Sequence, residues 1–186
     1  MKKNLVLLGM PGSGKSSLGK LLAKITGLKL YDIDKLIIEE IGLEIAEIFQ
    51  TKGEEFFRKI EEKKTLEILK KSNNIIALGG GGFLNEKIRS KILKNDYSVW
   101  LKWDKETLTS RLTKSKKRPI TYSLKKNDLI KLIEKRAKIY SLAKDFQYQI
   151  TNSKNFDFVG TMLNDYWHIK KALSSKVSNS KIEEIY

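Results

Sequence analysis

The chain has 186 residues, of which 40% are hydrophobic and 32% charged, with a formal net charge of +15 and no cysteine. This composition predicts one soluble globular domain and excludes a disordered chain, a disulfide scaffold and a thiolate metal site. No apolar run approaches the roughly 18 residues that span a bilayer, and no signal-peptide cleavage site follows the first apolar stretch. We therefore expect a cytoplasmic protein that binds no membrane.

The positive charge is distributed along the whole chain. Lysine pairs recur from one end to the other, mixed with glutamates and without neighbouring aromatic residues that could stack on bases. This pattern favours solvated helix faces over a nucleic-acid surface, so we expect no nucleic-acid partner. Only five of the 37 basic residues are arginines, namely Arg58, Arg89, Arg111, Arg118 and Arg136. Because arginine grips carboxylates and phosphates with two parallel hydrogen bonds, these are candidates for anion contacts, although Arg89 has the pattern of a helix salt bridge.

Strand and helix signals alternate along the chain. Apolar runs predict strands at 4–9, 28–32, 74–78, 97–103 and 147–151. Helical spacing predicts helices at 14–25, 34–41, 45–50, 53–71, 86–93, 105–113, 128–143 and 156–173. We expect a single domain over 1–173, with substrate-binding helices at about 34–62 and a mobile basic lid at about 114–126, followed by a polar tail at 174–186.

Strands joined by helices predict a three-layer α/β fold, in which a five-stranded parallel sheet is covered by helices on both faces. Ligands of such sheets bind beyond the carboxyl ends of the strands. Three unusual stretches follow three of the predicted strands, at 9–16, 32–34 and 79–82. The sequence therefore predicts a site assembled from these loops.

The first stretch reads GMPGSGKS and has the spacing of a phosphate-binding loop, G-x-x-x-x-G-K-S. Its backbone N–H groups and the following helix N-terminus are suited to phosphate oxygens, while Lys15 reaches the outer phosphates and the Ser16 hydroxyl binds Mg²⁺. The predicted ATP-binding residues here are Gly12, Ser13, Gly14, Lys15, Ser16 and Ser17. The motif predicts a nucleoside triphosphate but does not define the reaction.

Two carboxylates and a glycine run follow the next strands. Asp32 is placed to serve Mg²⁺, and Asp34 to bind or deprotonate a substrate hydroxyl. The alternative is that either aspartate caps the next helix, for which Asp34 is well placed, and a cap and a site role are compatible. Four glycines at 79–82 predict a ligand against bare backbone; a flexible turn is the alternative.

Three arginines have a suggestive context. Arg58 precedes Glu61 by three residues on one helix, so the carboxylate is placed to orient the guanidinium. Arg136 lies on the helix after the basic loop, and Arg118 lies within that loop. Such a loop is suited to close over a nucleotide and bring Arg118 to the transferring phosphate.

With these motifs assembled, the sequence resembles the shikimate kinase family. The resemblance covers roughly residues 3 to 155 and rests on GMPGSGKSS, YDID, GEEFFRKIE, LGGGG, KKRP and EKRAKIY in that order. A fourth glycine followed by Phe83, and the extension past residue 160, depart from the family pattern.

The resemblance implies an enzyme that transfers the γ-phosphate of ATP to the 3-hydroxyl of shikimate, in aromatic amino-acid synthesis. It implies that Asp34, Arg58, Gly80 and Arg136 bind shikimate, that Arg111 flanks the adenine, that Lys15, Asp34 and Arg118 are catalytic, and that Ser16 and Asp32 serve Mg²⁺. We expect a monomer.

Three other classes share part of this pattern. Gluconate kinases and nucleoside monophosphate kinases share the phosphate loop, but the arginine pair and glycine run favour shikimate. A GTPase switch would carry Asn-Lys-x-Asp after a late strand, and the chain has no such motif. A nucleic-acid-binding ATPase would place stacking aromatics on a basic face, and the sequence offers none.

Overall fold

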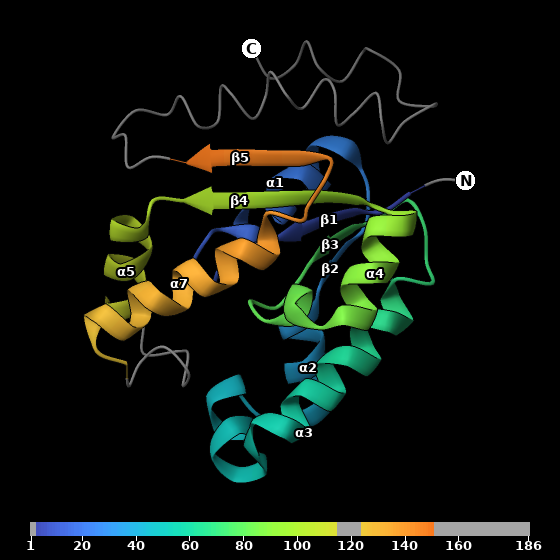
Figure 1. Cartoon of the computed structure of the whole chain (residues 1–186). Helices are drawn as coiled ribbons and strands as arrows, with labels where there is room; N and C mark the ends of the chain where they lie inside the picture. The colour runs from blue at the N-terminus through green and yellow to red at the C-terminus, as the bar shows by residue number, and fades with distance from the viewer. Residues whose placement is uncertain (1–2, 115–123, 151–186) are drawn as a thin grey trace.

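The chain folds around a parallel sheet of five strands in the order β2-β3-β1-β4-β5 (Figure 1). This computed structural model describes residues 3–114 and 124–150. The strands are β1 (Leu5–Leu8), β2 (Leu30–Asp32), β3 (Ile75–Ala77), β4 (Tyr97–Trp103) and β5 (Phe146–Ile150). All neighbouring strands are parallel, as the alternation of strand and helix signals predicts.

Helices connect the strands and cover the sheet. They are α1 (Lys15–Thr26), α2 (Ile33–Ile41), α3 (Ile45–Ile68), the 3₁₀ turn η1 (Gly82–Leu84), α4 (Glu86–Asn95), α5 (Lys105–Lys114) and α7 (Lys126–Tyr140). Figure 1 shows α4 and α7 in front of the sheet and α1 behind it. None of the described helices is long and apolar enough to cross a membrane.

The central strand β1 explains why its sequence is apolar throughout. Leu5 and Leu7 belong to a core cluster shared with α1, whereas Val6 and Leu8 belong to a larger cluster shared with α2, α3, α4 and α7. All four side chains are at most 1% exposed. A strand covered on both faces needs apolar residues at every position, because alternate side chains point to opposite faces.

Helix α3 contains the break between the two helices that the sequence predicts. It runs from Ile45 to Ile68, and Gly53 inside it has a non-helical backbone with φ 84° and ψ 166°. The predicted break is therefore confirmed, because two helical segments of α3 meet at a kink at Gly53. Glycine supplies this kink because positive φ is costly for residues with a Cβ. The C-terminal half of α3 carries Arg58 and Glu61 toward the sheet edge.

The N-cap of α2 is Asp32, which confirms that one of the two aspartates caps this helix, but the preference for Asp34 as the cap is wrong. The Asp32 carboxylate accepts a hydrogen bond from the Lys35 backbone N–H at 3.4 Å. The helix begins directly where β2 ends, which leaves no room for a cap at Asp34. Asp34 instead lies in the first turn, where the helix dipole favours a negative charge.

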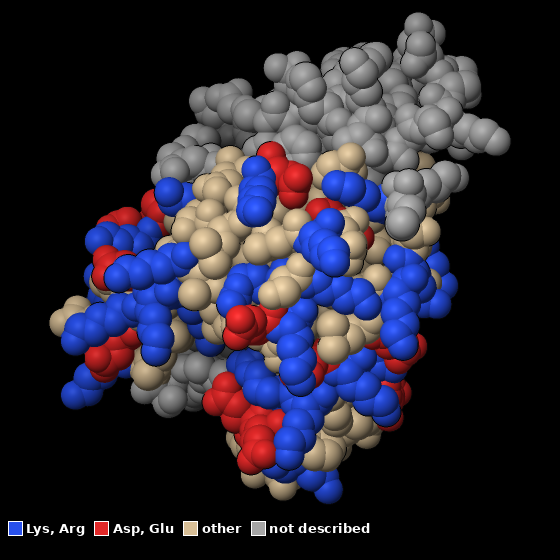
Figure 2. Space-filling view, turned by 45° about the vertical axis from the view of Figure 1, so that its right-hand side comes forward, with Lys and Arg blue, Asp and Glu red and all other residues tan. Residues whose placement is uncertain are grey.

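Several predictions fall outside the described residues. These are the lid with Arg118, the helix at 156–173 and the tail at 174–186. Within the described ranges, Figure 2 shows Lys and Arg spread over the visible face and interspersed with Asp and Glu. Exposed ion pairs such as Lys59–Glu55 (2.8 Å) contribute to this mixed surface. The face therefore does not resemble a single-sign stripe for a nucleic-acid backbone.

Candidate functional site

The phosphate-loop motif forms the turn between β1 and α1. Gly9, Gly12 and Gly14 have φ of 141°, 75° and 91°, values that favour glycine. Gly14 is the N-cap of α1, whose first turn carries no acidic residue. The positive end of the helix dipole therefore faces the predicted phosphate position without a competing carboxylate from its own first turn.

The charge of this loop comes from Lys15. Its Nζ donates to the carbonyl oxygens of Gly9 (3.0 Å) and Met10 (2.9 Å), and the residue is 7% exposed. Ser16 and Ser17 follow on the first turn of α1 and are exposed. The loop thus combines a buried cation with accessible hydroxyls at one helix start, which is the combination that a triphosphate requires.

Asp34 lies beside the glycine run. Strands β2 and β3 are neighbours, with Asp32 in register with Ala77, so the end of β2 lies next to the loop that follows β3. A Cβ on Gly79 would lie 2.7 Å from the Asp34 Oδ1 atom, and it would also overlap the Glu61 Oε1 atom. Gly79 therefore allows these two carboxylates to reach the same point at the edge of the sheet.

The next two glycines allow further close contacts. A Cβ on Gly80 would lie 2.5 Å from the ring of Pro11, and one on Gly81 would lie 2.7 Å from Arg58 Cζ. Gly82 has no such neighbour closer than 3.6 Å. At Gly80 the rigid Pro11 ring excludes a side chain, which argues against the alternative of a flexible turn, whereas a side chain at Gly79 or Gly81 would displace the ends of the neighbouring charged side chains. No described contact tests the predicted ligand against this backbone.

Arg58 is oriented by two carboxylates. Its NH1 donates to Glu61 Oε2 at 2.6 Å and its NH2 to Glu54 Oε1 at 3.1 Å. Burial favours the neutral form, but Glu61 and Glu54 outweigh it and raise the pKa of Arg58 above its ordinary value. The predicted contact with Glu61 is confirmed, whereas Glu54 was not recognised from the sequence.

Arg136 and Tyr140 both reach the glycine run from α7. Tyr140 Oη donates to the Gly80 carbonyl oxygen at 2.5 Å, and Arg136 NH1 contacts the same oxygen at 3.3 Å. Burial raises the pKa of Tyr140 to about 12, so its hydroxyl stays a donor at neutral pH. Tyr140 was missed from the sequence, although its spacing of four residues from Arg136 places both on one helix face.

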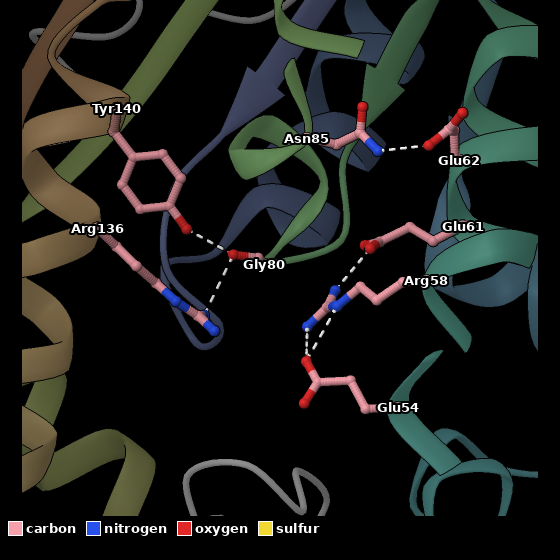
Figure 3. A network of polar contacts seen from close by, with 8 residues as sticks. All are labelled: Glu54, Arg58, Glu61, Glu62, Gly80, Asn85, Arg136 and Tyr140. Atoms are coloured by element: carbon pink, nitrogen blue, oxygen red, sulfur yellow. Dashed lines mark hydrogen bonds and ion pairs between the residues drawn. The ribbon is translucent and has the colours of Figure 1, made fainter. Parts of the chain in front are cut away.

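The two arginines open onto a common cavity of about 310 Å³. Its lining includes Arg58, Arg136, Gly81, Glu54, Glu61 and Glu62. Figure 3 shows the two guanidinium groups pointing toward each other from α3 and α7, with Gly80 between them. Such a pair is suited to a small molecule with one carboxylate, because each guanidinium offers a planar fork of donors.

Arg111 lies on α5 at the other side of the phosphate loop. Its NH1 donates to the Gly12 carbonyl at 3.3 Å, and its Cζ lies 3.6 Å from the centroid of the Trp103 ring. Trp103 Nε1 in turn donates to the Ser13 carbonyl at 2.9 Å. Trp103, which no sequence motif marks, therefore contacts both Arg111 and the loop.

Arg89 does not form the helix salt bridge that the sequence favoured. Its NH1 donates to the carbonyl oxygens of Phe83 (3.2 Å) and Leu84 (3.0 Å). These carbonyls end the 3₁₀ turn that follows the glycine run, and Phe83 is buried at 1% exposure. Arg89 thus holds the far end of this loop, and Phe83 supports it from the core.

The described part of the chain brings the predicted residues together in two neighbouring groups. The predicted ATP-binding residues of the loop, Gly12 to Ser17, form one turn with Arg111 beside it. Of the predicted substrate-binding residues, Gly80 belongs to the glycine run, and Asp34, Arg58 and Arg136 lie against it. Arg118 lies outside the described residues.

A family model and the sequences of relatives point to the same family. The sequence model described as shikimate kinase matches residues 11–167. A shikimate kinase from Bartonella quintana (strain Toulouse) is 41% identical over 143 residues, covering 76% of this chain and 68% of the relative. One from Persephonella marina (strain DSM 14350 / EX-H1) is 36% identical over 163 residues, covering 87% and 97%.

The fold is similar to that of solved shikimate kinase structures. Shikimate kinase from Acinetobacter baumannii in complex with shikimate matches with a TM-score of 0.80 at 24% identity, covering 91% of this chain and 96% of that one. Shikimate kinase from Aquifex aeolicus vf5 matches with a TM-score of 0.71 at 28% identity, covering 90% and 98%. By sequence and by fold, the chain belongs to the shikimate kinase family and is an ATP-dependent small-molecule kinase.

Proposed function

We propose that the chain transfers the γ-phosphoryl group of ATP to the 3-hydroxyl of shikimate, with the residue roles given below. One observation carries these roles: Arg58 and Arg136 line one cavity, and the glycine loop beside it packs against Pro11 of the phosphate loop. An acidic alcohol and a triphosphate would therefore meet across a single loop contact. The Acinetobacter baumannii enzyme with the same fold was solved with shikimate bound.

On the acceptor side, Arg58 and Arg136 grip the shikimate carboxylate, and the backbone of Gly80 lies against the substrate. Asp34 binds the hydroxyl and takes its proton as the hydroxyl oxygen attacks the γ-phosphorus. Its carboxylate suits this role because it lies at the same loop, and a positioned carboxylate is a common general base.

On the donor side, the loop amides and Lys15 stabilise the charge on the transferring phosphoryl group. The bond from the γ-phosphorus to the bridging oxygen breaks, and ADP leaves with the negative charge. Arg118, outside the described residues, is proposed to add a guanidinium from the lid. Ser17 and Arg111 complete the nucleotide contacts.

Ser16 and Asp32 are proposed to hold Mg²⁺, which when bound neutralises phosphate charge. Both residues offer the hard oxygen ligands that Mg²⁺ prefers, and Ser16 is exposed at the start of α1. Within the described residues, no group of three or more His, Cys, Asp or Glu side chains could hold a metal. Phosphate oxygens and waters would therefore have to complete the coordination. A cytoplasmic monomer without nucleic-acid or membrane partners stays our prediction.

A coupled assay of ADP release tests the substrate assignment. Shikimate, gluconate and nucleoside monophosphates are offered with Mg²⁺–ATP, and only shikimate is expected to support turnover. Arg58→Lys and Arg136→Lys are each expected to raise the KM for shikimate tenfold or more, because a bidentate carboxylate clamp contributes about 1.5–3 kcal/mol. Lys135→Ala, an exposed neighbour on α7, serves as the control. Turnover with gluconate alone would overturn the assignment, and an unchanged KM in both arginine variants would remove them from the site.

A further inference from the structure

We propose that Trp103 is a positioning residue for the nucleotide base. Its indole holds the Arg111 guanidinium flat beside the phosphate loop, so that the outer face of the guanidinium forms a stacking platform for a purine. The inference rests on the proposed function, because it requires a nucleoside phosphate in the loop.

Trp103 is tied to the loop through its indole N–H. It is the last residue of β4, which pairs with β1, and its Nε1 donates to the Ser13 carbonyl at 2.9 Å. A phosphate loop directs its N–H groups inward to the anion, so its carbonyls need donors from elsewhere. Trp103 provides one of these donors and is thereby placed at a defined position beside the loop.

Two contacts hold the guanidinium group of Arg111, one on its face and one at its edge. Its Cζ lies 3.6 Å from the Trp103 ring centroid, which is the distance of a stacked cation–π contact. Its NH1 donates to the Gly12 carbonyl at 3.3 Å. With one face against the indole and one edge on the loop, the plane of the guanidinium is set before any ligand arrives.

The chemistry of this arrangement favours a flat, uncharged partner. Arg58 contacts carboxylates in the acceptor cavity, whereas Arg111 contacts a carbonyl and a ring. Arg111 is also exposed, so the guanidinium surface away from Trp103 is accessible. Guanidinium planes stack well on nucleobases, and a plane held in advance loses less conformational freedom on binding. Trp103 would therefore increase affinity through the base and not through the phosphates.

Titration calorimetry with two ligands separates these contributions. Mg²⁺–ADP carries both base and phosphates, whereas Mg²⁺–tripolyphosphate carries phosphates alone. We expect Trp103→Leu to weaken ADP binding about tenfold while tripolyphosphate binding stays within about twofold. Trp103→Phe keeps an aromatic face without the indole N–H, and should restore ADP binding to within about threefold of the wild type.

A matched control lies at the opposite end of the same strand. The ring of Tyr97 also faces a cation, with Lys3 Nζ 4.7 Å from its centroid, but it opens β4 far along the strand from the loop. Tyr97→Leu should therefore bind both ligands like the wild type. Arg111→Lys keeps the charge but removes the plane, and it should reproduce the selective loss of ADP affinity with Trp103 intact.

The outcomes distinguish the inference from the function it rests on. If the wild-type chain binds neither ligand, the proposed function itself is rejected. Unchanged ADP affinity in Trp103→Leu or in Arg111→Lys would overturn the platform. An equal loss for ADP and tripolyphosphate would also overturn it, because Trp103 would then only support the loop. If Trp103→Leu fails to fold by circular dichroism, Trp103→Gln, which also removes the ring, is measured in its place with the same expected result.

Discussion

Arg58 on the acceptor side and Arg111 on the donor side are held in different ways. Arg58 contacts the carboxylates of Glu61 at 2.6 Å and Glu54 at 3.1 Å, whereas Arg111 donates to the carbonyl of Gly12 at 3.3 Å. A carboxylate orients a cation and also offsets its charge, while a carbonyl orients it without offsetting its charge. The charge of Arg58 is thus partly offset in return for a fixed direction, which suits a substrate with one carboxylate, whereas the carbonyl contact leaves the charge of Arg111 beside the phosphate loop.

The largest expected effect tests whether the chemistry resides on the acceptor half. Asp34→Asn removes a carboxylate that can take a proton, so turnover should fall roughly a hundred- to ten-thousandfold. Nucleotide affinity should stay unchanged, because the phosphate loop is intact. ADP release and calorimetry measure the two quantities. Asp128→Asn, in the first turn of α7, is the control, and an Asp34→Asn variant with full activity would reject the proposed role.

The second test asks whether the acceptor half depends on the direction of Arg58. In Gly81→Ala the new Cβ would lie 2.7 Å from Arg58 Cζ, whereas in Gly82→Ala the closest of these atoms is at 3.6 Å. Gly81→Ala should therefore raise the KM for shikimate about tenfold or more, and Gly82→Ala should leave it within about twofold. The KM for ATP should be unchanged in both. Equal values for the two variants would show that the close packing at Gly81 is unimportant.

The third test separates the two carboxylates that orient Arg58. The Glu61 side chain is 3% exposed and that of Glu54 is 56% exposed. Glu61→Gln should lower the free energy of unfolding by about 2 kcal/mol, because a buried hydrogen bond to a charged group is lost. Glu54→Gln should cost about 0.5 kcal/mol, as expected for an exposed ion pair. Urea denaturation measures both, and a larger loss for Glu54→Gln would contradict the ranking by burial.

The smallest expected effect concerns the contact between α7 and the glycine run. Tyr140→Phe removes the donor at 2.5 Å from the Gly80 carbonyl, while Arg136 still contacts it, so the loss should be about 1 kcal/mol at neutral pH. Urea denaturation measures it, with Tyr97→Phe as the control.

The same variant has a signature in alkaline solution. Burial raises the pKa of Tyr140 to about 12, above the value of about 10 for an unfolded chain. The stabilising contribution of its protonated hydroxyl is therefore complete below pH about 10 and is lost as the pH rises toward 12. The difference in stability between wild type and Tyr140→Phe should shrink over that range. A constant difference would mean that Tyr140 ionises equally in both states.

The fold was largely predictable because the spacing of apolar residues along the sequence reflects which side chains are buried. Strand β4 occupies Tyr97–Trp103, as predicted, since its apolar run reflects cover on both faces. The cap of α2 was less predictable: Asp32 and Asp34 both have cap chemistry, and only the pairing of β2 with β3, which ends at Asp32, decides between them. Local propensity carries no information about that pairing.

The site was predictable where a motif recurs at fixed spacing, as for Lys15 and the loop glycines. Trp103 and Tyr140 escaped notice because their partners Ser13 and Gly80 lie 90 and 60 residues away in the sequence. Arg89 was misread for a different reason. Its partners are backbone carbonyls, which every residue possesses and which no sequence pattern marks.

The contact between Pro11 and Gly80 has a consequence for how the two substrates are spaced. A proline ring lies so close to bare backbone that an added Cβ would be 2.5 Å from it. The two loops cannot approach more closely, so their separation is fixed by van der Waals contact. In the proposed mechanism this contact also fixes the separation of the phosphate donor and the alcohol. Substitutions elsewhere would change what each pocket admits, but in the proposed mechanism the distance of phosphoryl transfer would still be set by this one pair of residues.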